Sequence, residues 1–209
     1  MKFMTALMGS ALLAFGTVHA AENVDASSPS QLIETSAQAM LKDLDANRAA
    51  YKQDPAKISA LVEKYLLPNF DVDYSAQLVL GRHWRTATPD QRKRFIDAFY
   101  KSLLRNYGSA IAEFTGDRLR VIPSKVEPTA DRATVRTEVK RSDGSRIPVN
   151  YSLRKTDTGW KAWDVVIEGI SYVKSFRDDF GAQIDSQGID AVITRLEKGE
   201  IVKPAPGTT

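Results

Sequence analysis

The spacing of hydrophobic positions changes about halfway along the chain. Over residues 28–113, apolar residues recur every three or four positions, which is the period of an amphipathic helix. Ser28, Asp54 and Thr88 each precede a proline, and a capping residue followed by proline at the first helical position marks a helix start. With a short helix around residues 74–80, the pattern predicts four helices in this half.

Residues 117–168 follow the two-residue period of β-strands instead. Apolar and polar side chains alternate from Arg132 to Lys140, and the hairpin turn signal Asp143-Gly144 comes shortly afterwards. Large residues at both odd and even positions from Trp160 to Ile167 predict a central strand that is covered on both faces. Helical spacing returns over residues 170–198, where two more helices are expected.

This order of helices, antiparallel strands and helices predicts an α+β fold, with the helices segregated to one side of a curved sheet. We expect one domain over residues 21–202, because this length suits a single core, and we expect residues 203–209 to be a disordered tail. A strongly twisted sheet wrapped by helices often encloses a cavity. The apolar pattern alone leaves open whether inward side chains line such a cavity or fill a packed core.

The N-terminus has the three-part pattern of a secretory signal. Lys2 is followed by an uncharged apolar run over residues 3–18, and Val18-His19-Ala20 has the small-x-small form that signal peptidase cleaves. The run is shorter than the roughly 20 apolar residues of a membrane-spanning helix. We therefore expect residues 1–20 to be a signal peptide cleaved after Ala20, with an uncleaved anchor as the alternative.

The composition excludes several kinds of chemistry. The chain has no cysteine and two histidines, of which His83 alone would remain after cleavage of the signal peptide. Thiol catalysis, iron–sulfur clusters and multi-histidine metal sites are thereby excluded, and no cofactor or metal is expected. His83 is expected to pack on Trp84 at a helix end. The cations are interleaved with acids and form no basic stripe, so nucleic acid is not expected as a partner.

Carboxylates offer one route to an enzyme. Asp164 and Glu168 flank the end of the last long strand, where they could meet at the mouth of a cavity as an acid–base pair. The competing interpretation gives structural hydrogen bonds to these carboxylates, and helix-start roles to Asp71 and Asp73. A mixed-charge surface leaves a third interpretation, which is an adaptor protein without a ligand.

Two runs of residues resemble the hallmarks of the MlaC family, also called the toluene-tolerance auxiliary family. The first run extends from Phe70 to Tyr107 and includes Leu80-Gly81-Arg82-His83-Trp84, Thr88-Pro89-Asp90-Gln91 and Phe95. The second extends from Trp160 to Phe180 and includes Trp163-Asp164-Val165-Val166-Ile167-Glu168-Gly169. Trp163 stands where the family pattern suggests Tyr, and Lys174-Ser175-Phe176 where it suggests an Asn-Tyr pair. These departures could reshape the edge of a pocket.

The resemblance implies an NTF2-like sheet with added helices, including an N-terminal helical extension. It also implies a periplasmic phospholipid carrier without enzymatic activity, which holds acyl chains in an apolar cavity and leaves the headgroup in water. The implied partners are an outer-membrane lipoprotein–porin complex and an inner-membrane ABC transporter that carries a hexameric lipid-binding ring. Such a carrier would maintain outer-membrane lipid asymmetry.

The expected cavity lining comes from the inward strand faces and the neighbouring helices. The lining residues are Phe99, Leu103, Tyr107, Val135, Val139, Val149, Tyr151, Val165, Ile167 and Tyr172. Each of them could fill a packed core instead. Arg82, Arg146 and Arg177 are candidates for contact with the lipid headgroup or a partner protein, with solvated surface as their alternative role.

Overall fold

The structure, a computed structural model, describes residues 26–112, 119–123, 129–140 and 143–200 of the 209-residue chain. The predicted signal peptide, residues 1–20, and the predicted tail, residues 203–209, lie outside the described residues. Among the residues that are described, no helix is both long and apolar enough to span a membrane.

Helices make up the first half of the described chain, as the apolar spacing predicts. They are α1 (Pro29–Ala46), α2 (Arg48–Gln53), α3 (Pro55–Tyr65), the 3-10 turn η1 (Leu67–Asn69), α4 (Val72–Leu80), α5 (His83–Thr86) and α6 (Pro89–Ala112). The predicted caps are confirmed: Ser28 Oγ accepts from the Gln31 N–H at 3.2 Å, and Asp54 Oδ1 from the Ala56 N–H at 3.0 Å. The short helices α2 and α5 were not predicted.

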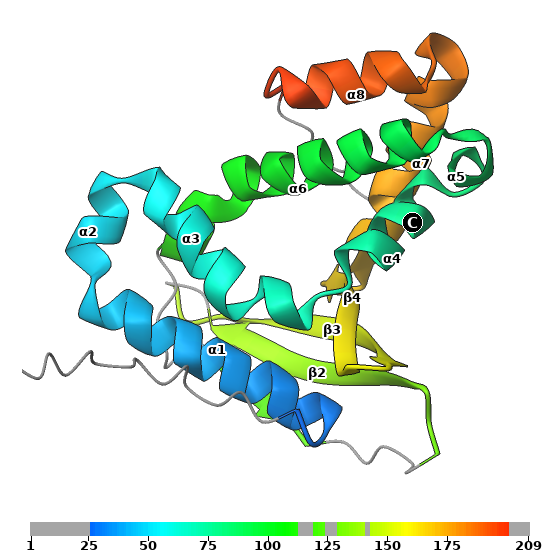
Figure 1. The fold of residues 1–209 in the computed structure, drawn as a ribbon. Helices are drawn as coiled ribbons and strands as arrows, with labels where there is room; N and C mark the ends of the chain where they lie inside the picture. Colours follow the sequence, from blue (N-terminus) through cyan, green and yellow to red (C-terminus); the bar gives the residue numbers. More distant parts are fainter. Residues whose placement is uncertain (1–25, 113–118, 124–128, 141–142, 201–209) are drawn as a thin grey trace, which may run out of the picture.

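The strands form an antiparallel meander that confirms the α+β expectation. The strands are β1 (Leu119–Ile122), β2 (Arg132–Lys140), β3 (Arg146–Thr156), β4 (Gly159–Ile167) and β5 (Ile170–Ser171), and they pair in chain order. Two helices follow the sheet, α7 (Tyr172–Gln187) and α8 (Ile189–Glu197). Figure 1 shows α3, α6 and α8 together on one side of the sheet.

The prediction that residues 160–167 form the central strand is wrong. β3 lies in the middle of the sheet, and β4 pairs with β3 on one side and with the two-residue β5 on the other. The register shifts between Ser152 and Leu153, so that Trp163 becomes the extra residue of a β-bulge. The bulge places Ala162 on the same face as Val165, which explains the large residues at both odd and even positions.

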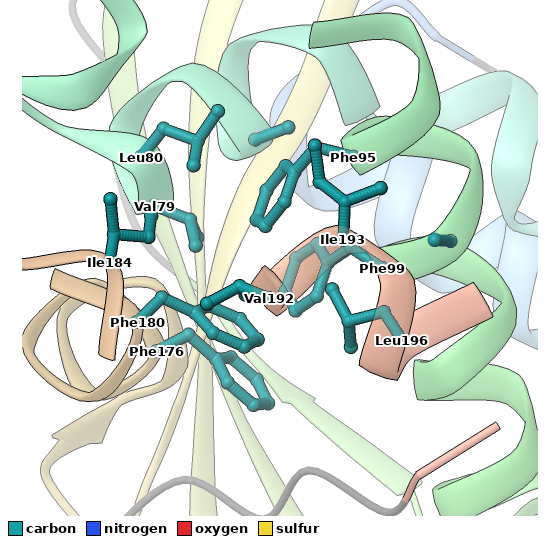
Figure 2. Close-up of a cluster of buried hydrophobic side chains, with 12 residues drawn as sticks. Val79, Leu80, Phe95, Phe99, Phe176, Phe180, Ile184, Val192, Ile193 and Leu196 are labelled. Atoms are coloured by element: carbon teal, nitrogen blue, oxygen red, sulfur yellow. The ribbon is translucent and has the colours of Figure 1, made fainter. Parts of the chain in front are cut away.

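The buried apolar side chains form three separate clusters. The largest, the helical core, joins α4, α6, α7 and α8, and Figure 2 shows its phenylalanine rings facing one another. A second cluster joins α1 and α3 through residues such as Leu44 and Leu61. In the third, Leu32 of α1 packs on Val135 and Leu153 of the sheet.

Candidate functional site

The sheet face that points toward the helices is almost entirely apolar. We call it the inner face and define it through strand register, which pairs Val135 with Tyr151 and Tyr151 with Val165. Its residues are Leu119, Val121, Ala133, Val135, Thr137, Val139, Ile147, Val149, Tyr151, Leu153, Ala162, Val165 and Ile167. The predicted alternation of β2 and β3 is therefore confirmed.

One end of the inner face is sealed and the other is not. Leu32 of α1 covers Val135 and Leu153, which have relative exposures of 0% and 1%. Toward the opposite end, Val139, Ile147, Val165 and Ile167 all keep partial exposure, although they are apolar and face the helical side of the sheet. Apolar side chains on an inward face normally lose this exposure to packed neighbours.

Thr137 and Tyr151 are the two polar side chains among the inner-face residues, and the exposed Lys155 continues the face beyond Leu153, opposite Trp160. Thr137 is buried, and its hydroxyl donates to the Val149 carbonyl at 2.6 Å, so it places no unpaired polar group on the surface. Burial raises the pKa of Tyr151 to about 12, with no charged neighbour contributing to the shift. Tyr151 nevertheless keeps partial exposure. Tyr151 thus lies in apolar surroundings that disfavour its charged form.

Helix α6 faces this surface without packing tightly onto it. The principal neighbours of α6 are α2, α3, α4 and α8, and the strands are not among them. Leu103 and Tyr107 of α6 are half-buried, and the Tyr107 ring lies 5.9 Å from the ring of Tyr172 at the start of α7. Burial raises the pKa of Tyr107 to about 12, and Tyr172 adds to the rise. Leu103 and Tyr172 also pack against the helical core.

The structure divides the ten predicted lining residues into two groups. Phe99 belongs to the helical core, where its ring lies 5.0 Å from that of Phe176, and Val135 belongs to the sealed cluster with Leu32. Val149 is buried as well. The half-buried residues are Leu103, Tyr107, Val139, Tyr151, Val165, Ile167 and Tyr172.

Sequence reasoning left out Ile147, which lies opposite Val139 and shares its partial exposure. Its place in the alternating pattern with Val149 and Tyr151 was the signal that could have included it. The unusual Trp163 does not belong to the inner face, because its ring lies edge-on to the ring of Tyr74 of α4 at 5.7 Å. Phe176, the other departure from the family pattern, lies in the helical core.

The three predicted arginines lie at two separate places. Arg82 forms an ion pair with Asp185 of α7, and Arg177 Nε lies 3.7 Å from Asp178 Oδ1. Arg146 begins β3, one residue before Ile147, and its guanidinium lies 4.0 Å from Glu138. All three are exposed. Arg146 alone is therefore close to the open end of the inner face.

The candidate catalytic carboxylates have structural partners. Asp164 is buried and accepts from the Ser171 hydroxyl at 2.6 Å and the Val173 N–H at 3.0 Å, which ties β4 to the start of α7. Glu168 is exposed in the turn before β5, with a φ of 51°. One carboxylate is thus buried and the other faces solvent. The described part of the chain contains no group of three His, Cys, Asp or Glu residues that could hold a metal.

The helix-start carboxylate and the single histidine of the domain are also structural. Asp71 Oδ1 accepts from the Tyr74 N–H at 3.1 Å, which confirms its predicted role at the start of α4. Its other oxygen accepts from Arg154 Nε at 2.6 Å. His83 begins α5 and is half-buried, with its Nε2 at 3.4 Å from Asp185 Oδ1. The histidine thus lies at a helix end, as predicted.

Two depressions on the surface do not coincide with the candidate site. One, of about 280 Å³, is lined by Asn47 and by residues of α2 and α3 such as Tyr51. The other, of about 230 Å³, is lined by Asp71, Arg154 and the β3–β4 turn. Neither contains any of the predicted lining residues or arginines. We assign the candidate site to the inner face and the adjoining part of α6 because Val139, Ile147, Val165 and Ile167 keep partial exposure there.

Comparison with known proteins finds one matching family model and several similar curated proteins. A family model described as "MlaC protein" matches residues 34–198. The chain is 32% identical over 168 residues to the toluene tolerance protein ttg2D of Pseudomonas putida, which covers 80% of this chain and 78% of that protein. It is 25% identical over 174 residues to a Haemophilus influenzae protein named intermembrane phospholipid transport system binding protein MlaC, covering 82% and 81% of the two chains.

A solved structure has the same fold. It is the phospholipid-binding protein of Ralstonia solanacearum, determined at 1.53 Å in complex with a phospholipid. The two structures superpose with a TM-score of 0.75 at 23% identity, and the match covers 80% of this chain and 93% of the other.

Proposed function

Because the chain belongs to the MlaC family, we propose that it is a periplasmic phospholipid carrier that holds acyl chains between the inner face of its sheet and helix α6. The observation that carries this proposal is the partial exposure of Val139, Ile147, Val165 and Ile167 on a face that points inward. The names of its relatives support it, since one is a phospholipid transport protein and a structural neighbour contains a phospholipid.

The distribution of the core supports a hollow at this place. A domain of this size usually has one contiguous hydrophobic core with small satellites. Here three clusters are separate, and the half-buried Val139, Ile147, Val165 and Ile167 of the inner face belong to none of them. Each Å² of apolar surface that stays in contact with water forgoes about 25 cal/mol of the free energy that its burial would provide. Acyl chains would recover that loss by covering the surface.

The energetics of exchange agree with a carrier that needs no catalytic residues. Each methylene that leaves water gains about 0.8 kcal/mol, so two long acyl chains represent on the order of 20 kcal/mol. A lipid that leaves a bilayer forfeits this energy, and an apolar cavity restores most of it. Exchange is then close to balance, and the direction of transport depends on partners.

We assign the partners through the family. The protein would carry lipid between an outer-membrane lipoprotein–porin complex and an inner-membrane ABC transporter with a hexameric lipid-binding ring, which would maintain outer-membrane lipid asymmetry. Export to the periplasm would use residues 1–20 as a cleaved signal peptide. Arg82, Arg146 and Arg177 remain candidates for headgroup or partner contact, although strand register places the side chain of Arg146 on the face opposite the acyl chains.

Lipid content tests the proposal directly. The protein purified from cells is extracted with organic solvent, and phospholipid per protein is measured by mass spectrometry. Placing a charge on the inner face by Val139→Arg should lower the lipid content about tenfold or more, because a charge is costly to leave unpaired among acyl chains. Val149 is a poorer site, because its burial would let an arginine disturb folding.

Thr134→Arg is the matched control, because Thr134 is exposed on the same strand and points to the opposite face. This variant should keep the lipid content of the unaltered protein. Circular dichroism and the urea midpoint establish that both variants are folded. An empty unaltered protein would favour a ligand-free adaptor, and equal lipid in both variants would exclude the inner face as the binding site.

A further inference from the structure

Arg and Lys residues that are separated along the sequence lie together on the outward face of the sheet. Register places the even-numbered positions of β1, β2 and β3 on this outer face, opposite the apolar side chains. Six of these positions carry Arg or Lys, and Glu138 is the one carboxylate among them. The whole chain has a formal net charge of only +3, so the outer face is far more basic than the average surface.

Five of the six cations remain accessible, and we call them the basic sheet face: Arg120, Arg132, Arg136, Lys140 and Arg146. The sixth, Arg154, is paired with Asp71 at 2.6 Å. Arg120 and Arg146 share Glu138 through long contacts of 3.9 and 4.0 Å, and their side chains are 69% and 44% exposed. Among the described residues, Arg136 and Lys140 have no ion-pair partner.

The rest of the outer face contributes little that a folded protein partner would need. Thr134, Pro148, Asn150 and Ser152 lie between the cations, and Ile122, which is half-buried, is the one larger apolar residue. Protein interfaces normally contain an apolar and aromatic centre, and single-stranded nucleic acid needs aromatic side chains on which bases can stack. The outer-face positions of β1, β2 and β3 carry no aromatic residue, and the ring of Tyr74 of α4 is already contacted by Arg132 and Arg154, at 5.8 and 4.3 Å.

A bilayer rich in anionic headgroups has the matching chemistry. It presents many negative charges in a plane and requires no pocket, and each Lys or Arg near such a surface strengthens binding about fivefold. Neighbouring strands are about 4.8 Å apart and alternate residues about 7 Å apart. These spacings are within the Debye length of about 8 Å at physiological ionic strength, so the cations act together.

We infer that the basic sheet face docks the protein reversibly on an anionic lipid surface, separately from any lipid held on the inner face. The inference goes beyond the proposed carrier function and does not depend on it, because the two surfaces are opposite faces of one sheet. Docking is electrostatic, so it weakens with salt and with each cation removed. A surface that releases its membrane easily suits a protein that moves between membranes.

Vesicle sedimentation tests the inference. The full-length mature protein is mixed with vesicles of equal parts phosphatidylglycerol and phosphatidylcholine, or of phosphatidylcholine alone, at low and high salt. Arg136→Gln with Lys140→Gln should weaken binding to the anionic vesicles about 20-fold, and Glu138→Gln should strengthen it up to about fivefold by releasing Arg120 and Arg146. Binding to phosphatidylcholine should stay weak throughout.

The control is Lys52→Gln with Lys57→Gln, which removes the same charge from exposed positions on α2 and α3. It should change vesicle binding less than twofold. Equal losses in both double variants would overturn the assignment to the sheet face, and no preference for anionic vesicles would overturn the membrane partner. The Val139→Arg protein separates this inference from the carrier proposal, because it should lose its own lipid and still bind anionic vesicles.

Discussion

The helical core and the inner face of the sheet are both apolar, yet only the helical core is filled. In the helical core, Phe95 and Phe180 have no exposed surface, and their rings meet edge to face at 5.6 Å. On the inner face, Val139 and Val165 keep partial exposure although they point toward the helices. Hydrophobicity alone therefore does not decide whether a surface packs or binds. The deciding factor is whether the side chains of the opposing element are long enough to fill the space between the two surfaces.

Side-chain size accounts for the difference. The facing helices α6 and α7 each contribute phenylalanines one turn apart, such as Phe95 with Phe99, whose long rings interdigitate across the interface. The open part of the inner face presents mainly Val and Ile, which are short and stiff. Short side chains fill a gap only when the opposing element lies close, and α6 has helices as its main neighbours.

The largest expected effect compares the two surfaces through the free energy of unfolding. Phe180→Ala should destabilise the protein by about 3–5 kcal/mol, because it opens a cavity inside a closely packed cluster. Val165→Ala on the inner face should cost about 1 kcal/mol or less, because its side chain is already only partly packed. Urea unfolding of the lipid-free proteins measures both values. Similar losses at the two sites would mean that the inner face is packed like the helical core.

The next effect concerns the helices that flank the open face. Asp43 of α1 accepts from the hydroxyls of Tyr51 and Tyr65, each at 2.8 Å, and from Lys64 Nζ at 3.2 Å. These contacts join α1, α2 and α3, and α3 is in turn packed against α6. Burial raises the pKa of Asp43, but its hydrogen bonds outweigh burial and hold the pKa below 3.8.

Removing this carboxylate should therefore change stability with pH. Asp43→Asn should cost about 1–3 kcal/mol at pH 7, because two tyrosine hydroxyls lose a charged acceptor. A depressed pKa stabilises the fold above the unfolded value of 3.8 and ceases to do so as pH falls through the folded value. The two proteins should thus converge in stability below pH 3.8. Glu63→Gln, on the exposed side of α3, is the control and should follow the unaltered protein at every pH.

The sequence was sufficient for the long helices, the long strands and the family, but not for the short elements or for the division between core and lining. Period and caps predicted the long helices, and alternation predicted which faces of β2 and β3 point inward. Phe99 and Leu103 show the limit, since both lie on one predicted stripe of α6. Phe99 is in the core and Leu103 is only half-buried. The position of α7 determines which of the two side chains is fully buried, and the local sequence pattern of α6 carries no information about that position.

The bulge and the basic sheet face show the same limit. Trp163 looked like a residue on the covered face of a central strand because an uninterrupted two-residue period was assumed. The register shift at Ser152 depends on pairing with β3, which the β4 sequence does not reveal. The cations of β1, β2 and β3 are interleaved with other residues along the chain, and strand pairing alone brings them onto one face.

The smallest expected effect concerns Thr137, the buried hydroxyl residue of the inner face. It tests whether this hydroxyl is bonded only to the protein backbone or also contacts the bound lipid. The Thr137 hydroxyl donates to the Val149 carbonyl at 2.6 Å, so it adds no unpaired polar group to the inner face. Thr137→Val keeps the shape and removes this bond, so it should cost about 1 kcal/mol and leave the lipid content unchanged. Urea unfolding and lipid extraction of the same sample measure the two quantities. A clear loss of lipid would mean that the Thr137 hydroxyl contacts the ligand, and that the inner face recognises a polar group as well as hydrocarbon.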